Sequence, residues 1–334
     1  MTSRGRPTLP HPHTPTLPHS HVSKLKTYMQ LLRLPNLPTA VADVLMGFLL
    51  VRGDFSEGTI LALLVGASCL IYLAGMVLND VYDQEVDARD RPHRPIPSGR
   101  VHPGFARLLG MQMLVLGMAL AWLASYLAED WRAGLVSAGL VAMVYLYDRV
   151  LKQTPLGPAA MGACRMLNVL LGASAAGIDG TPWQAVHNVA AGGIGLYVVG
   201  VTLFARTEAQ TSSRAQLTLA MLIMLLGIGL LSTLVEWPDQ MALRHVLPHT
   251  FHVSAPMRWY LSWAALAVLA TWRCAWAICQ PTPGMVQMAV KQCILSLVVL
   301  DAAASYPAAG FIGAAVIMAL LIPATTLGRW IYST

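Results

Sequence analysis

Apolar stretches of about 20 residues recur along almost the whole chain, and no other feature limits its possible folds so strongly. Each stretch is long enough to cross the hydrocarbon core of a bilayer as an α-helix. The 334 residues are 56% hydrophobic and only 11% charged, whereas a soluble domain carries about a quarter charged residues. The sequence therefore predicts an all-α integral membrane protein.

The apolar stretches divide the chain into predicted membrane-spanning helices. A weaker candidate at 285–305 is interrupted by Lys291 and Asp301, so the sequence leaves nine or ten spans open. Residues 1–23 are rich in Pro, His, Ser and Thr, and we expect them to form a disordered tail ahead of a membrane domain at 24–334. The nine stronger spans are 36–52, 59–80, 106–128, 131–150, 157–177, 187–206, 216–235, 258–279 and 309–327.

Lysine and arginine residues concentrate in alternate loops: before the first span and after the second, fourth and sixth. Positive residues accumulate in cytoplasmic loops, so we expect these loops to face the cytoplasm, in a bacterial inner (cytoplasmic) membrane. The net charge of +6 is modest and suits an anionic ligand or leaflet. Its distribution does not predict binding to nucleic acid.

A cluster of acidic residues follows directly on the second predicted span, in the stretch LNDVYDQEVDARDRPHRPIPSGR at 78–100. Carboxylates gathered on one helix face repel one another, and each costs up to about 3 kcal/mol at full membrane depth. A bound cation would neutralise the face, and its hard oxygen ligands suit Mg²⁺, which often bridges to substrate phosphates. If the helix continues through this stretch, four side chains fall within an arc of roughly 100°: Asn79, Asp80, Asp83 and Asp87.

Two other interpretations of the acidic cluster stay open: a solvated helix end with a chance acidic face, and a structural Ca²⁺ site. The twelve-residue loop pattern of the common Ca²⁺ site is missing. Arg91, Arg94 and Arg100 follow the cluster, and Arg149 and Lys152 follow the fourth span on the same side. These cations could bind the diphosphate that Mg²⁺ neutralises only in part. They could equally reflect the usual positive charge of cytoplasmic loops.

These motifs together resemble the UbiA superfamily of membrane prenyltransferases. The resemblance is carried by the pattern NDxxDxxxD at 79–87, by RPIPSGR at 94–100, and by Tyr147 and Lys152 near the end of the fourth span. It covers most of the chain, starting from LLRLPNLPTAVADVLMGFL at 31. It implies a bundle of about nine helices around a central cavity. It also implies Mg²⁺-dependent transfer of a prenyl group from an allylic diphosphate to an acceptor.

The resemblance further implies roles for individual residues. Asn79, Asp80, Asp83 and Asp87 would hold the Mg²⁺–diphosphate, Arg33 and Lys152 would contact the diphosphate, and Tyr147 would lie at the cavity edge.

The chain departs from the family at the second aspartate-rich motif, which the family carries after its sixth helix with two or three carboxylates. TLFARTEAQTSSR at 202–214 has Glu208 as its only acid, and Arg206 and Arg214 could replace part of the charge of a metal subsite. CRMLNVLLG at 164–172 and LFARTEAQ at 203–210 resemble the EboC-like branch of the family.

Several polar residues lie inside predicted spans, where ionisable groups are usually functional. Arg165 and Asn168 share one face of the fifth span at i,i+3, Asp43 lies in the first span, and Asp301 in the weak tenth. Arg165 requires an anionic partner in hydrocarbon. Either the substrate diphosphate or Asp43 could supply it, and the sequence leaves both open.

The function expected from these residues is Mg²⁺-dependent prenyl transfer to an acceptor that the sequence does not identify. Mg²⁺ and the cations would stabilise the departing diphosphate, and a dry apolar cavity would protect the allylic cation from water. The alternative is a carrier that binds an isoprenoid lipid without chemistry. The predicted catalytic groups are Asp80, Asp83, Asp87 and Glu208.

The variant Glu208→Gln distinguishes the prenyltransferase hypothesis from the lipid-carrier hypothesis. If Glu208 completes the metal site of an enzyme, the variant should lose Mg²⁺-dependent release of inorganic diphosphate from a prenyl diphosphate. Release is measured by phosphate detection after pyrophosphatase treatment, and binding of the free prenol serves as the control. Diphosphate release at the unmodified rate would contradict a catalytic role for Glu208.

Overall fold

The computed structural model describes residues 24–179, 183–206, 212–237 and 256–332, and these residues form helices and connecting turns without a β-strand. The all-α prediction is confirmed. The α-helices are α1 (Lys24–Leu31), α2 (Leu37–Arg52), α3 (Gly58–Tyr82), α4 (Gln84–Asp90), α5 (Pro103–Leu127), α6 (Arg132–Arg149), α7 (Gly157–Ala173), α8 (Ala185–Ala205), α9 (Arg214–Ser232), α11 (Pro256–Cys279), α12 (Pro283–Ala319) and α13 (Leu321–Tyr332). The short 3₁₀ helices are η1 (Leu34–Asn36), η2 (Leu151–Gln153), η3 (Ser174–Asp179) and η4 (Thr233–Glu236).

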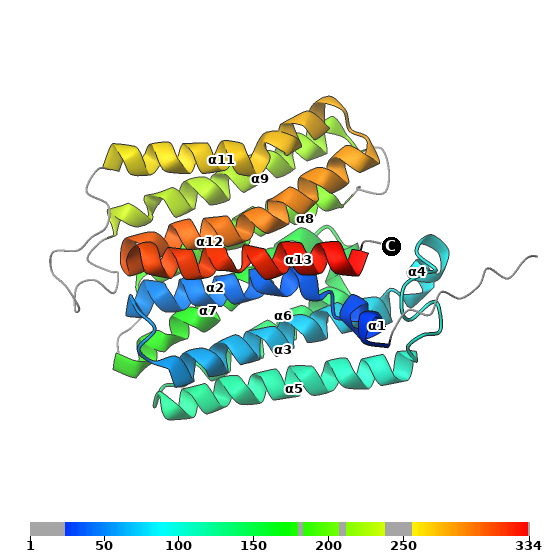
Figure 1. Cartoon of the computed structure of the whole chain (residues 1–334), viewed down its shortest axis with the longest axis horizontal. Coiled ribbons are helices and arrows are strands. Elements are labelled where there is room, and N and C mark those ends of the chain that lie inside the picture. The colour runs from blue at the N-terminus through cyan, green and yellow to red at the C-terminus, as the bar shows by residue number, and fades with distance from the viewer. Residues whose placement is uncertain (1–23, 180–182, 207–211, 238–255, 333–334) are drawn as a thin grey trace, which may run out of the picture.

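The long helices run side by side along the long axis of the molecule, and α2 lies in the interior between α7 and α12 (Figure 1). Every side chain from Val44 to Leu50 is buried. A helix that is hydrophobic all round belongs inside a bundle, which explains why α2 has neighbours on several faces. It ends at Gly53, whose φ of 74° is the left-handed conformation that glycine adopts without strain.

Eight segments of the described residues are long and apolar enough to cross a membrane. The last of them, Pro283–Arg329, has 47 residues, and one straight helix of that length would measure about 70 Å. Gly310, with φ 63° and ψ −160°, breaks this segment, and the chain runs in opposite directions along α12 and α13 (Figure 1). The segment therefore makes two passes through the bundle, and its first half contains the weak candidate span at 285–305.

α6 is not among those eight segments, yet it makes a further pass of 18 residues beside α3, α5 and α7. The described chain thus crosses the bundle ten times, which favours the ten-span alternative over nine. An even number of passes brings α1 and the C-terminal end of α13 to the end of the bundle that also carries α4 (Figure 1).

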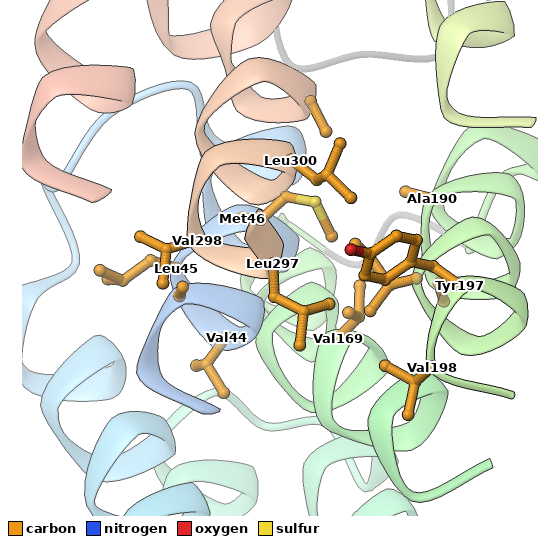
Figure 2. Close-up of a cluster of buried hydrophobic side chains, with 14 of the residues drawn as sticks. Val44, Leu45, Met46, Val169, Ala190, Tyr197, Val198, Leu297, Val298 and Leu300 are labelled. Carbon is orange, nitrogen blue, oxygen red and sulfur yellow. The ribbon is translucent and has the colours of Figure 1, made fainter. Parts of the chain in front are cut away.

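The interior is filled by apolar side chains from helices that are distant in sequence (Figure 2). Met46 of α2, Val169 of α7 and Leu297 of α12 meet around Tyr197 of α8, and all four are buried. The Tyr197 hydroxyl donates a 3.0 Å hydrogen bond to the Cys293 carbonyl, which satisfies its polar atom. Large apolar side chains also lie exposed on the outer surface, where lipid would cover them: Leu116, Trp122, Leu226, Leu269, Phe311 and Ile312.

Two glycines set the distance between the central helices α2 and α7. A Cβ on Gly47 would overlap the Val169 carbonyl oxygen, and a Cβ on Gly172 would overlap the Val44 carbonyl oxygen. Small residues at such a crossing let two backbones approach closely, which is a major source of helix association in lipid.

We therefore expect Gly47→Ala to destabilise the protein, because the added methyl group must push α2 away from α7. A lower melting temperature in detergent, followed by tryptophan fluorescence, is the expected result. Gly229→Ala in α9 is the matched control, because nothing lies within 4 Å of a Cβ there, and alanine favours a helix over glycine by about 1 kcal/mol. Equal melting temperatures for the two variants would contradict close packing at Gly47.

Candidate active site

The acidic cluster lies where α3 passes into α4. The predicted continuous helix is interrupted here, because α3 ends at Tyr82 and Asp83 has φ −91° and ψ 4°. The helical hydrogen bonds nevertheless continue: the Asp83 amide donates to the Asn79 carbonyl at 2.9 Å, and the Asp87 amide to the Asp83 carbonyl at 2.8 Å. These bonds keep Asn79, Asp83 and Asp87 on successive turns.

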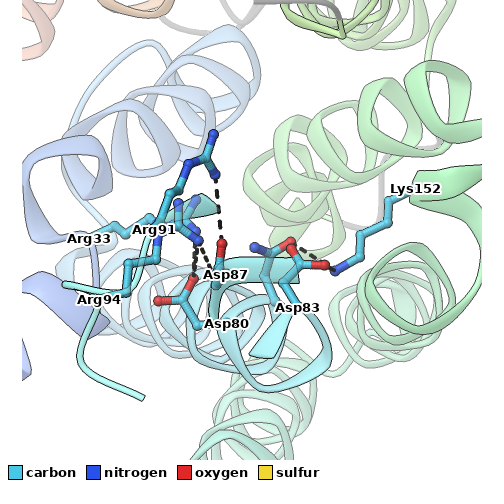
Figure 3. Close-up of polar contacts among 8 residues, drawn as sticks. Arg33, Asp80, Asp83, Asp87, Arg91, Arg94 and Lys152 are labelled. Carbon is cyan, nitrogen blue, oxygen red and sulfur yellow. Dashed lines mark hydrogen bonds and ion pairs between the residues drawn. The ribbon is translucent and has the colours of Figure 1, made fainter. Parts of the chain in front are cut away.

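Arginines neutralise the two buried carboxylates of the cluster (Figure 3). Asp80 Oδ1 lies 2.6 Å from Arg33 Nη2 and 3.3 Å from Arg94 Nη1. The same Arg94 nitrogen lies 2.5 Å from Asp87 Oδ2. Asp80 and Asp87 side chains are only 4% and 3% exposed, so these pairs are screened far less than surface ion pairs.

The backbone of Arg33 adopts an uncommon conformation. Its φ of 46° and ψ of 44° lie in the left-handed region, which costs a non-glycine residue of order 1 kcal/mol. This conformation forms the turn between α1 and η1. The short ion pair to Asp80 offsets the cost and joins the N-terminal segment to the end of α3.

Lys152 of η2 neutralises the third carboxylate. Its Nζ lies 2.6 Å from Asp83 Oδ1 and 3.4 Å from Asn79 Oδ1, so a cation contacts two of the predicted metal ligands. Figure 3 shows Lys152 directed toward Asp83. Among the described residues, no three carboxylate, histidine or cysteine side chains gather into a metal-binding group. Mg²⁺ needs only one or two carboxylates when water and substrate phosphates supply its other ligands. The Asn79–Asp83 oxygen pair, which already holds an ammonium, fits such an ion.

Two cavities meet at this cluster. A polar cavity of about 460 Å³ is lined by Asn79, Asp83, Asp87, Lys152 and, from the end of α8, Arg206, together with Arg91. A narrower cavity of about 160 Å³ runs into the bundle between α3, α6 and α7, and its wall is mostly apolar. Asn79 and Tyr147 line both cavities. Charge is therefore concentrated at the mouth of an apolar tunnel.

The inner end of the narrow cavity carries the intramembrane polar residues. Arg165 Nε lies 3.0 Å from Asp43 Oδ2, and its Nη2 donates to the Thr39 carbonyl at 3.0 Å. Asn168 donates to the same Asp43 oxygen at 3.0 Å, and its own oxygen accepts a 2.6 Å bond from Ser68. Of the two partners left open for Arg165, the structure provides Asp43.

Some predicted site residues lie elsewhere. Arg100 lines neither cavity; it donates to the His93 carbonyl, to Ser98 and to Gln30 of α1, and so fastens the 91–101 loop. Partial burial lowers the pKa of Arg100, but a guanidinium stays charged in proteins. Glu208 lies outside the described residues, so its predicted role as a metal ligand stays a prediction.

Sequence reasoning missed one residue of the cavity wall, Asp148 in the last turn of α6. It lines the narrow cavity beside Tyr147 and is 3% exposed. The signal was present in the sequence: a carboxylate at the end of an apolar span and directly after the residue expected at the cavity edge.

Comparison with known proteins gives a family and relatives. Residues 40–333 match the UbiA prenyltransferase family. The digeranylgeranylglyceryl phosphate synthase of Saccharolobus solfataricus is 40% identical over 133 residues, which are 39% of this chain and 44% of the relative. The synthase of Methanopyrus kandleri is 34% identical over 154 residues, 44% of this chain and 54% of the relative. The alignments thus span about half the length of these curated relatives.

Two solved structures share the fold. One, described as digeranylgeranylglyceryl phosphate synthase in membranes, superposes with a TM-score of 0.60 and 21% identity, over 86% of this chain and 99% of that chain. The other is a UbiA homologue from Archaeoglobus fulgidus bound to GPP and Mg²⁺, with a TM-score of 0.55 and 13% identity, over 81% and 99% of the two chains. At these identities the likeness concerns the fold alone.

Removal of Arg94 tests the electrostatic structure of the cluster. Arg94→Gln leaves Asp80 and Asp87 buried with weaker compensation, and breaking a buried ion pair from one side costs roughly 3 kcal/mol. We expect a loss of that order in the free energy of unfolding, measured by denaturant titration in detergent. Arg91→Gln is the control, because Arg91 is 44% exposed and 3.9 Å from Asp87; its loss should stay below about 1 kcal/mol. Equal losses would contradict a dominant role for Arg94.

Proposed function

Because this chain belongs to the UbiA prenyltransferase family, we propose that it transfers a prenyl group from an allylic prenyl diphosphate to a hydroxyl of a glycerol phosphate derivative. One observation carries the proposal: a cavity lined by cations and carboxylates opens, at Asn79 and Tyr147, into an apolar cavity within the bundle. A prenyl diphosphate has the same division into an anionic head and an apolar tail.

The polar cavity supplies what a diphosphate head requires. Lys152, Arg91 and Arg206 line it and carry positive charge, and both lysine and arginine bind phosphate oxygens. Asn79 and Asp83 would hold Mg²⁺, with Asp87 as a further oxygen donor facing the same cavity. Bound Mg²⁺ would supply Lewis-acid stabilisation of the leaving diphosphate.

Lys152 would have different partners before and after the metal binds. Its ammonium pairs with Asp83 in the structure, and a metal ion at Asp83 would release it toward the diphosphate. The lysine would then donate hydrogen bonds to the oxygen that gains charge as the C–O bond breaks. Preorganised cations at this position stabilise the transition state more than the bound substrate.

The narrow cavity would hold the prenyl tail and keep water away from the allylic cation. Ile71, Met76, Val144 and Met161 supply its apolar wall. Water that entered would capture the cation and turn transfer into hydrolysis, so exclusion of water is part of the chemistry. Tyr147, at the junction of the two cavities, would lie beside the reacting carbon.

The names of the relatives guide the choice of acceptor. The relatives' name states a product with two geranylgeranyl groups on glyceryl phosphate. A geranylgeranylglyceryl phosphate with one free hydroxyl is accordingly the acceptor that we propose.

The same names do not support the finer placement in the EboC-like branch, which rests on the stretches 164–172 and 203–210. The enzyme is favoured over a lipid carrier because a carrier has no need of paired carboxylates beside a phosphate site.

The basic loops assign an orientation to the proposed site. Lys24, Arg91, Arg149, Lys152 and Arg214 belong to segments at the α4 end of the bundle. The positive-inside rule then places this end, and the polar cavity with it, at the cytoplasmic face. A diphosphate made in the cytoplasm would reach the site without crossing the bilayer.

Asp83→Ala tests the donor site. The variant should stay folded and lose Mg²⁺-dependent binding of geranylgeranyl diphosphate, because it lacks the carboxylate that faces the polar cavity and pairs with Lys152. Binding is measured with radiolabelled geranylgeranyl S-thiolodiphosphate, a non-transferring analogue, with and without Mg²⁺. Asp54→Ala is the control, because Asp54 lies in the turn after α2, at the other end of the bundle, where it accepts a hydrogen bond from the Ser56 amide. Unchanged Mg²⁺-dependent binding by Asp83→Ala would refute the proposed site.

A further inference from the structure

Asp148 is a carboxylate inside the cavity system that the proposed donor site does not use. It lies in the last turn of α6, immediately after Tyr147, and it lines the narrow cavity. The whole residue is only 3% exposed. It is thus placed just inside the junction of the polar and apolar cavities, on the side where the prenyl tail would begin.

One oxygen of this carboxylate has no hydrogen-bond partner. Within the described part of the chain, nothing donates a hydrogen bond to the buried Asp148 Oδ2. A buried polar atom left without a partner costs about 1–3 kcal/mol, and more when the group is charged. Such a cost is typical of sites that act on a ligand, where the partner arrives with the substrate.

The nearby lysine is paired elsewhere. Lys152 lies one helical turn further along the chain, but its Nζ is engaged by Asp83 and Asn79. No ion pair joins Asp148 to a cation among the residues that the structure describes. The charged and titratable groups that face Asp148 from the surrounding elements are Arg33, Asp80, Asp83, Tyr147, Lys152 and Cys164.

The facing helix carries a glycine close to the oxygen that lacks a partner. Gly75 of α3 lies opposite, and a Cβ built there would be 3.9 Å from Asp148 Oδ2 and 3.0 Å from Val144 Cγ1. Because residue 75 is a glycine, α3 places no side chain of that residue against the Asp148 carboxylate. In the proposed scheme, the acceptor hydroxyl would approach Asp148 from the narrow cavity that this residue lines.

We propose that Asp148 is the catalytic base that binds the acceptor hydroxyl and takes its proton. This role rests on the proposed function, because it requires a hydroxyl acceptor. In the step, the bond between prenyl C1 and the diphosphate oxygen breaks, and its electron pair leaves with the diphosphate. The acceptor oxygen forms the new C1–O ether bond, and the hydroxyl proton passes to the Asp148 carboxylate. Loss of that proton to water resets the site.

The position of Asp148 suits a base that acts apart from the groups that bind the leaving diphosphate. Asn79, Asp83 and Lys152 line the polar cavity on the leaving-group side, whereas Asp148 lines only the narrow cavity. A base placed there would approach the reacting carbon from a different direction than the diphosphate. Separate sites for leaving group and proton also keep the base out of the coordination sphere of the metal.

Asp148→Asn in the full-length protein tests the role. The donor is geranylgeranyl diphosphate with Mg²⁺, the acceptor probe is geranylgeranylglyceryl phosphate, and ether formation is followed by mass spectrometry. General-base catalysis contributes typically 10²- to 10⁴-fold, so we expect ether formation to fall by at least about 100-fold. The affinity for geranylgeranyl S-thiolodiphosphate should stay within about threefold, because the amide keeps the size of the side chain. Asp148→Glu, which keeps a carboxylate, should recover a measurable part of the rate.

Each other outcome overturns the inference. Ether formation within threefold of the unmodified rate would show that no proton transfer depends on Asp148. Equal losses of ether formation and donor affinity would place Asp148 in the donor site. Asp130→Asn, in the turn between α5 and α6, should change neither quantity. If the unmodified chain makes no ether from this acceptor, the acceptor assignment fails and the base role fails with it, whereas the donor site is judged separately by Asp83→Ala.

Discussion

The structure depends on the neutralisation of three aspartates by cations that come from three separate segments. Arg33 precedes the first long helix, Arg94 lies in the loop after α4, and Lys152 follows α6. Burial of the Asp80 and Asp87 carboxylates would be costly without these partners. The same ion pairs therefore join distant parts of the chain and leave a compact, highly charged surface at one end of an apolar bundle.

This arrangement would suit an anionic lipid precursor. The polar and the narrow cavity share Asn79 of α3 and Tyr147 of α6 in their walls, so the head and tail of the proposed ligand would meet adjoining surfaces. Lys152 pairs with Asp83 and donates to Asn79, so the charge of Asp83 is compensated by a residue of the protein itself. Close packing of α2 against α7 at Gly47 and Gly172 keeps the wall of the cavity in place.

Much of the fold was predictable from the sequence, because lipid imposes a length and an apolar composition on every span. The predicted span at 59–80 corresponds to Gly58–Tyr82, and that at 258–279 to Pro256–Cys279. The two passes of Pro283–Arg329 correspond to the predicted span at 309–327 and the weaker candidate at 285–305, and the break between them lies at Gly310. The acidic face was visible from helical spacing, but its partners were not, because ion pairs between Asp80 and Arg33 or between Asp83 and Lys152 join residues that are distant in sequence. Asp148 was missed because only the folded structure places it in the wall of the narrow cavity.

The central claim is that Asn79 and Asp83 hold a divalent cation that binds a prenyl diphosphate whose tail enters the narrow cavity. The most direct test is a crystal structure with Mn²⁺ and geranylgeranyl S-thiolodiphosphate, in which anomalous scattering locates the metal. The account predicts an anomalous peak in contact with Asp83, diphosphate oxygens within hydrogen-bond distance of Lys152, and a tail passing Tyr147 between α3 and α7. A metal bound away from Asp83, or a tail lying on the outer surface of the bundle, would contradict it.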